Sequence, residues 1–228
     1  MKKNNLLFLS HPYTTDTPSY GNRDMIKITS NSSIKLGETA NSSCWVFTNN
    51  HIGTHIDVPF HFNEDGKKVA DYKANEWFFS NIALVDVPCN EAVLISDKYI
   101  NSYDIDENID MLLIRTGYER YRKNDKYWND NPGLDPGLAS YLREKFPKLR
   151  CVGFDFISIT SWKYRQEGRE SHKNFLALVN KKRAILAIED MSLNKIDNRI
   201  DWLLVAPIIV EDGNGAPVTV IANLEKIK

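Results

Sequence analysis

Short apolar runs, separated by polar and turn-forming residues, recur along almost the whole chain. Runs of four to nine residues rich in Val, Ile, Leu and aromatic side chains predict β-strands. They lie at residues 6–9, 25–29, 44–48, 82–87, 111–115, 151–156, 184–188, 202–210 and 218–222. Helical spacing of apolar residues predicts helices at 136–146 and 170–179. The pattern therefore predicts an α/β protein with more strands than helices.

The length and composition favour one folding unit. A chain of 228 residues with 42% hydrophobic content can bury a sizeable core, and no internal repeat or linker interrupts it. Gly213-Asn214-Gly215 lies between two predicted strands and lacks the lysine and following helix of a phosphate-binding loop. We interpret it as a hairpin turn. The prediction is a single domain spanning residues 1–228.

Charge and cysteine content exclude several classes of partner. A formal net charge of −1 gives no reason to expect nucleic acid or an anionic membrane as a partner. The apolar run at 6–9 is too short for the core of a secretion signal, and no segment is long enough to span a bilayer. Cys44, Cys89 and Cys151 are odd in number and widely spaced, which fits a reducing cytoplasm.

The densest cluster of potential metal ligands lies at residues 51–61. This segment contains three of the five histidines, His51, His55 and His61, together with Asp57. Imidazole nitrogens and carboxylate oxygens are ligands that zinc and manganese accept. A metal-dependent hydrolase that activates water is the leading hypothesis.

These side chains can meet only if the backbone bends. On a straight strand His51 and His61 would lie roughly 33 Å apart. Gly53, several β-branched residues and Pro59 disfavour a continuous helix. We expect a turn near Gly53 to bring His51 beside His55, and two extended steps to place Asp57 on the same side. Pro59 can then redirect the chain so that His61 faces the same centre.

The segment HIGTHIDVPFHF at 51–62 matches the pattern H-x-G-T-H-x-D-x-P-x-H-F in full. With it, the sequence resembles the cyclase family of metal-dependent hydrolases, which includes kynurenine formamidases and isatin hydrolases. Further similar segments cover nearly the whole chain, namely LSHPYTTDTPSYGN, LLIRTGY, NPGLDP, VGFDFISI and ILAIEDMSL. The resemblance implies a swivelling β/β/α arrangement with mixed sheets, and a homodimer or higher homo-oligomer.

The resemblance also implies roles for individual residues. His51, His55 and Asp57 correspond to metal ligands, with the aspartate able to bridge two ions, and His61 corresponds to a proton shuttle. His172 and Glu189 correspond to the remaining ligands, and the residues around 180–183 look like an insertion between them. Asp190 adjoins Glu189, but successive strand residues point to opposite faces, so only one of them can face the metal. The implied cofactor is one or two divalent ions, zinc first and manganese as the alternative.

Aromatic residues near the cluster are candidates for contact with a small-molecule substrate. Tyr20 corresponds to a position that often carries an aromatic residue near the substrate in this family, and Phe62 closes the metal motif. The segment 118–128 has three tyrosines, a tryptophan and many charges. It is either a mobile lid or a solvated helix and loop that packs on one face.

The chemistry expected from this resemblance is hydrolysis of a C–N amide bond, in an aryl formamide such as N-formylkynurenine or in a cyclic amide. His61 would move the proton, since an imidazole with a pKa of about 6.5 suits transfer in both directions. The alternatives are a cyclase, dehydratase or lactone hydrolase of a biosynthetic pathway, and a relative that binds a metal or ligand without catalysis.

Overall fold

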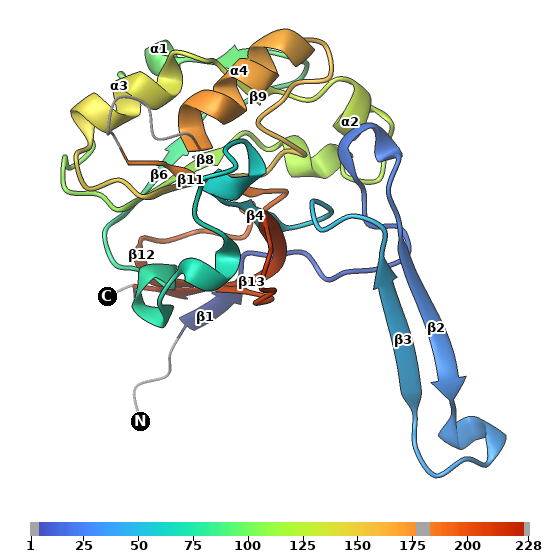
Figure 1. The fold of residues 1–228 in the computed structure, drawn as a ribbon. Coiled ribbons are helices and arrows are strands. Elements are labelled where there is room, and N and C mark those ends of the chain that lie inside the picture. Colours follow the sequence, from blue (N-terminus) through green and yellow to red (C-terminus); the bar gives the residue numbers. More distant parts are fainter. Residues whose placement is uncertain (1–4, 177–182, 226–228) are drawn as a thin grey trace.

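The computed structural model describes residues 5–176 and 183–225 (Figure 1). Most of its strands belong to one large mixed sheet: β1 (Asn5–Phe8), β4 (His55–Asp57), β5 (Phe78–Phe79), β6 (Ile82–Asp86), β8 (Met111–Arg115), β10 (Cys151–Phe154), β11 (Leu186–Glu189), β12 (Ile200–Pro207) and β13 (Gly215–Leu224). The strand order is β5-β12-β13-β4-β11-β10-β8-β6, and β1 pairs with β13. The last strand in this order, β6, lies close to β12, so the sheet is nearly closed into a barrel.

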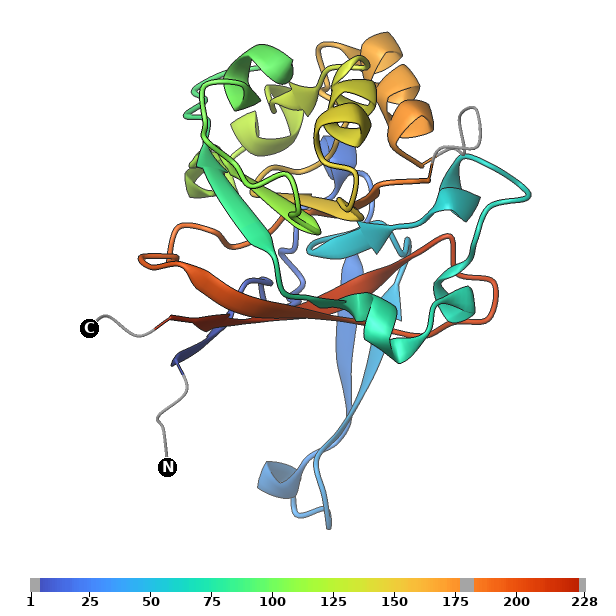
Figure 2. The ribbon, with the colours of Figure 1, turned by 90° about the vertical axis from the view of Figure 1, so that its left-hand side faces the viewer.

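The helices cover one half of this sheet. They are α1 (Asp97–Ile100), α2 (Lys126–Asn129), α3 (Leu138–Lys145) and α4 (Arg165–Leu176). In Figure 2 they form the upper layer, the strands β6, β8, β10 and β11 form the middle layer, and β12 with β13 forms the lower layer. This arrangement is the mixed α/β fold with β/β/α layers that the sequence predicted. None of the helices in the described ranges is long and apolar enough to cross a membrane.

Two hydrophobic cores lie on opposite faces of the middle layer. Along β8, Leu112 and Ile114 pack into the core beneath the helices, and Met111 and Leu113 pack into the core against β12 and β13. All four are fully buried. A parallel strand with both faces buried needs apolar residues at every position, which explains the uninterrupted apolar run at 111–114.

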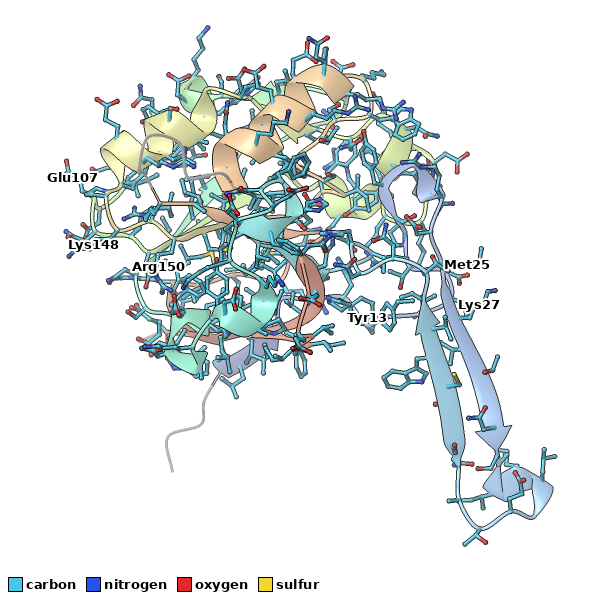
Figure 3. All side chains as sticks on the ribbon, in the orientation of Figure 1. Tyr13, Met25, Lys27, Glu107, Lys148 and Arg150 are labelled. Carbon is cyan, nitrogen blue, oxygen red and sulfur yellow. The ribbon has the colours of Figure 1, made fainter. Side chains whose placement is uncertain are left out.

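A β-hairpin, here called the arm, consists of residues 26–47 and projects from the rest of the molecule (Figures 1 and 3). Its strands are β2 (Ile26–Ser32) and β3 (Ser42–Phe47). At its root, beside the labelled Met25 in Figure 3, the ring of Tyr13 packs edge-on against Phe47 at 5.4 Å between centroids. Further out, Trp45 is 68% exposed and Leu36 is 83% exposed. The remaining strands, β7 (Leu94–Ile95) and β9 (Gly133–Leu134), form a small parallel pair.

Several predicted boundaries were wrong. The helix expected at 136–146 begins at Leu138, and the one expected at 170–179 begins at Arg165. The end of the latter, like most of the expected insertion at 180–183, lies outside the described residues. The expected hairpin turn is a longer connection, because β12 ends at Pro207 and Gly215 is already part of β13. Strand β4 was not found among the apolar runs, because two of its three residues, His55 and Asp57, are polar and face the candidate site.

Candidate metal centre and active site

The histidine-rich segment bends where glycine and proline allow it. Gly53 has a φ of 62°, in the left-handed region that favours glycine. The bend brings the rings of His51 and His55 to 5.3 Å between centroids. After β4, a short 3-10 helix starts at Pro59 and ends at His61, whose ring stacks on that of His51 at 3.9 Å. The segment has the geometry that its sequence indicated.

Strand pairing brings Glu189 to the same place. His55 and Asp57 lie on one face of β4, and Ile56 between them points into the core. The neighbouring strand β11 runs antiparallel to β4, with Glu189 directly opposite His55. Directly paired residues point to the same face of a sheet, so Glu189 joins the two side chains of β4.

Four side chains form what we call the inner cluster: His55, Asp57, His172 and Glu189. The Nε2 atom of His55 lies 3.3 Å from Glu189 Oε2 and 3.5 Å from Asp57 Oδ1. The Nε2 atom of His172, on α4, lies 3.6 Å from both Asp57 Oδ2 and Glu189 Oε1. Each of the four residues is at most 5% exposed. Two imidazoles and two carboxylates therefore alternate around one buried point.

Hydrogen bonds to backbone carbonyls fix both imidazoles of the inner cluster. Nδ1 of His55 donates to the Gly53 carbonyl at 2.8 Å, and Nδ1 of His172 donates to the Gly168 carbonyl at 2.9 Å. Thr160 Oγ1 lies 3.0 Å from the same Nδ1 of His172. A proton on Nδ1 leaves a lone pair on Nε2, which is the arrangement that metal-binding histidines require. The Nε2 atom of His55 is buried and has no hydrogen-bond partner in the described part of the chain.

The other two histidines, His51 and His61, are here called the outer pair. His51 lies 2.7 Å through Nδ1 from Asp57 Oδ1, and 2.9 Å through Nε2 from Asn214 Oδ1. Asn50 also donates to Asn214 Oδ1, so this oxygen is an acceptor, and it accepts a hydrogen bond from His51 Nε2 as well. His51 is therefore held between Asn214 and Asp57.

The distances of the inner cluster fit a divalent ion. In a tetrahedral site with bonds of about 2.1 Å, neighbouring ligand atoms are about 3.4 Å apart. The separations from His55 Nε2 to Glu189 Oε2 and to Asp57 Oδ1, 3.3 Å and 3.5 Å, match that value, and His172 Nε2 approaches the other oxygen of each carboxylate at 3.6 Å. The nitrogen and oxygen donor set, the unpartnered His55 Nε2 and the two buried carboxylates all agree with such an ion. Asp57 is shared between the groups His55–Asp57–Glu189 and His51–Asp57–His61, so a second ion has donors as well.

The electrostatics of the cluster favour positive charge. Burial acts to lower the pKa of His55, but the neighbouring carboxylates of Glu189 and Asp57 outweigh it and raise the pKa to about 9. For Asp57, burial acts in the raising direction, but His51 and the other imidazoles bring the pKa below its usual range. Burial lowers the pKa of His61 to about 4, so its ring is neutral at pH 7. Two carboxylates buried this deeply require compensating positive charge.

Asp190 points away from the inner cluster, and it follows the end of β11 with a φ of 53°, so its direction is not set by the strand alternation that we expected from the sequence. It is fully buried, and Arg122 donates to it through Nε at 2.9 Å and Nη2 at 2.8 Å. The hydroxyl of Tyr127 donates to the same carboxylate. Tyr118 and Tyr127 are both fully buried. The aromatic segment 118–128 is therefore packed on the body of the protein, which favours the ordered helix and loop over the mobile lid.

A cavity of about 200 Å³ opens onto the metal-binding atoms. Tyr20 and Phe62 line it together with the inner cluster and the outer pair. The ring of Phe62 stacks on His172 at 4.9 Å and meets His61 edge-on at 4.7 Å. His11 lies outside this cavity and lines two neighbouring ones.

The sequence model of a family described as "Putative cyclase" matches residues 7–161. The chain belongs to this family. The matched range includes the segment 51–62 and the arm, and ends before His172 and Glu189. The sequence-based recognition of the cyclase family is thus confirmed.

Two kynurenine formamidases and two solved structures are similar to this chain over most of its length. The kynurenine formamidase of Bacillus cereus is 30% identical over 171 residues, which are 75% of each chain. That of Bacillus anthracis is 29% identical over the same length. Isatin hydrolase A from Labrenzia aggregata has a TM-score of 0.78 at 18% identity, covering 98% of this chain and 94% of its own. A structure described as a potential metal-dependent hydrolase with cyclase activity has a TM-score of 0.75 at 24% identity, covering 98% and 100%. The cyclase fold thus extends over nearly the whole chain.

Sequence reasoning missed two residues of the site. Asn214, interpreted only as part of a turn, contacts His51. At Gly215, a Cβ atom would lie 2.6 Å from His51 Cε1, so only glycine allows this approach. The glycines on either side of Asn214 signalled an unusual backbone, but their distance of more than 150 residues from His51 hid the contact.

Proposed function

We propose that this protein is a metal-dependent hydrolase that cleaves a C–N amide bond, in an aryl formamide such as N-formylkynurenine or in a cyclic amide. The observation that carries the proposal is the inner cluster, where two imidazoles and two carboxylates alternate at 3.3–3.6 Å beside a cavity. Similarity to kynurenine formamidases and isatin hydrolases supports amide hydrolysis as the reaction class.

The inner cluster would hold the ion. His51, whose Nδ1 lies next to Asp57 Oδ1, would be a further ligand. Zinc suits this donor set best, manganese is the alternative, and the shared Asp57 supports up to two ions. When bound, a divalent ion lowers the pKa of a coordinated water from 15.7 toward about 7 and polarises a carbonyl oxygen. The backbone carbonyls of Gly53 and Gly168 keep the imidazoles in the tautomer that such binding needs.

His61 is the proposed proton carrier. It lines the cavity beside the inner cluster, and its stacking on His51 leaves it half-buried and oriented. A neutral ring at pH 7 accepts a proton from the attacking water on a ring nitrogen, and then delivers it to the departing amine nitrogen. The products are a carboxylate, formate in the case of a formamide, and a free amine.

Tyr20 and Phe62 would bind the flat part of the substrate. The stack of Phe62 on His172 places an aromatic face next to the metal-binding atoms. Aromatic rings of a substrate pack favourably against such a face, in stacked or edge-on geometry. An aryl group next to the scissile amide fits this wall.

The test is hydrolysis of N-formylkynurenine by protein stripped with a chelator and then restored with zinc or manganese. We expect activity to vanish on stripping and to return with metal. Stoichiometric metal with no hydrolysis of formamides, cyclic amides or lactones would contradict a hydrolase. Absence of any metal binding would contradict the site itself.

We also propose that a second copy of this chain covers the arm. An isolated two-stranded hairpin is only marginally stable in water, yet the arm exposes Ile28 and Trp45 directly opposite each other on one face. It carries three charged residues in 22 positions, against 26% charged residues in the whole chain, and such depletion is typical of interfaces.

Sedimentation velocity checks this assembly. Wild-type protein should be a dimer or larger, and Trp45→Ser with Leu36→Ser should release folded monomers. The exposed, charged Lys35→Ser at the arm's tip is the matched control and should leave the oligomer intact. A wild-type monomer, or an unchanged oligomer in the double variant, would contradict the proposal.

A further inference from the structure

Two arginines near the active-site cavity pack against the same indole. Arg23 lines the cavity itself, and Arg165 is the first residue of α4, the helix that carries His172. Both contact the indole of Trp162, with guanidinium carbons 5.8 Å and 4.6 Å from the ring centroid. Contact with an indole face holds a guanidinium in place and leaves its N–H groups free to bind.

The chain that contacts Trp162 has an uncommon backbone conformation. Gly21 and Asn22 are consecutive residues with φ of 65° and 50°, both in the left-handed region. A Cβ atom at Gly21 would lie 2.3 Å from Cζ3 of Trp162, so the turn and the indole are in direct contact. The ring of Tyr20, which lines the cavity, also packs against Trp162 at 5.1 Å between centroids. Trp162 therefore contacts the turn, a residue of the cavity wall and both arginines.

The two positive charges are not compensated. Among the described residues, neither Arg23 nor Arg165 has a carboxylate within ion-pair distance, whereas Arg122 is paired with Asp190. Asp24 also lines the cavity, but its carboxylate accepts a hydrogen bond from Asn49. Burial raises the pKa of Tyr20, and the charges of Arg165 and Arg23 oppose that rise. Both charges thus act on the cavity wall beside the substrate-binding tyrosine.

We infer that Arg23 and Arg165 bind a carboxylate of the substrate, at the end remote from the amide that is cleaved. This inference rests on the proposed amide hydrolysis and narrows its substrates to aryl amides that carry a carboxylate. A guanidinium offers two parallel N–H donors that match the two oxygens of a carboxylate. Because Arg23 and the metal-binding atoms line the same cavity, one small molecule can reach both.

Paired substrates test this assignment. N-formylkynurenine and its methyl ester contain the same formamide, and only the acid carries the carboxylate. Wild-type protein should cleave the acid about tenfold more efficiently in kcat/KM. Arg165→Gln and Arg23→Gln should each raise KM for the acid about threefold to tenfold, with kcat and the ester little changed. Arg169→Gln, an exposed arginine one turn further along α4, is the control and should change neither substrate.

The outcomes separate this inference from the proposed function. Equal cleavage of acid and ester by wild-type protein would overturn the carboxylate site and leave amide hydrolysis standing. If neither compound is cleaved, calorimetric titration with benzoate decides the carboxylate site independently of turnover. Wild-type protein should then bind benzoate at least about threefold more tightly than the Arg23→Gln, Arg165→Gln double variant. Equal affinity would overturn the inference.

Discussion

The inner cluster and the outer pair use the same residue type in two different ways. Both histidines of the inner cluster are at most 5% exposed, and a backbone carbonyl fixes the Nδ1 atom of each. In the outer pair, side chains provide the support: His51 contacts Asp57 and Asn214, and His61 stacks on His51. Backbone support suits fixed ligands, whereas a ring held only by side chains can exchange protons within the cavity. This difference supports the proposed roles, with the inner cluster and His51 as metal ligands and His61 as the proton carrier.

Removing a carboxylate from the inner cluster should have the largest effect. In Asp57→Asn, two imidazoles lose the oxygen that lies between them, and metal binding should be lost. Activity should fall about 10³-fold or more, since a metal ion contributes several kcal/mol to the reaction. Metal content by mass spectrometry and turnover measure this together. Asp24→Asn, another carboxylate of the same cavity, is the control; full metal content in Asp57→Asn would refute the assignment.

Replacing the imidazole of His61 should separate proton transfer from metal binding. In His61→Gln we expect kcat to fall about 10²- to 10⁴-fold, the usual contribution of a general acid–base group. Metal content should stay at the wild-type value, because all four residues of the inner cluster remain. A variant with unchanged kcat would show that another group moves the proton.

Loss of the side chain that supports His51 should weaken binding without abolishing it. In Asn214→Ala, metal affinity should fall about tenfold to a hundredfold, as is usual for partners of metal-binding histidines. Competition with a fluorescent chelator measures this affinity. Asp212→Ala, which removes an exposed ion pair with Lys68 in the same connection, should leave affinity unchanged. If both variants bind metal equally well, Asn214 does not position His51.

The smallest effect is expected where the backbone provides a duplicate contact. In Thr160→Val, Nδ1 of His172 loses the hydroxyl at 3.0 Å but keeps the Gly168 carbonyl at 2.9 Å. Metal affinity should therefore fall less than about tenfold. Ser171→Ala, on the same helix and buried without a hydrogen-bond partner in the described residues, should cause no loss. An effect larger than that of Asn214→Ala would reverse the comparison between the two parts of the site.

Half of the inner cluster, His55 and Asp57, could be anticipated because its signals are local. Gly53, Pro59 and the spacing of His55 and Asp57 determine the path of one short segment, and the fold class follows from the apolar runs. His172 and Glu189 lie far along the chain and were expected only through the family resemblance. Asp190 was expected to point away because of strand alternation, but it lies beyond the end of β11, and its partner Arg122 was not foreseen. Contacts that depend on the closure of the sheet could not be predicted. Asn214 reaches His51 only because β13 pairs with β4, a pairing between segments far apart in the sequence.

Anomalous X-ray diffraction from zinc-loaded crystals would locate the metal ion itself. We predict a zinc peak among Nε2 of His55, Nε2 of His172 and the carboxylates of Asp57 and Glu189, at bonds of about 2.0–2.2 Å. A second peak shared by Asp57 and His51 would agree with two ions. Zinc bound by His51 and His61 without any atom of His55, His172 or Glu189 would refute the inner cluster as the metal site.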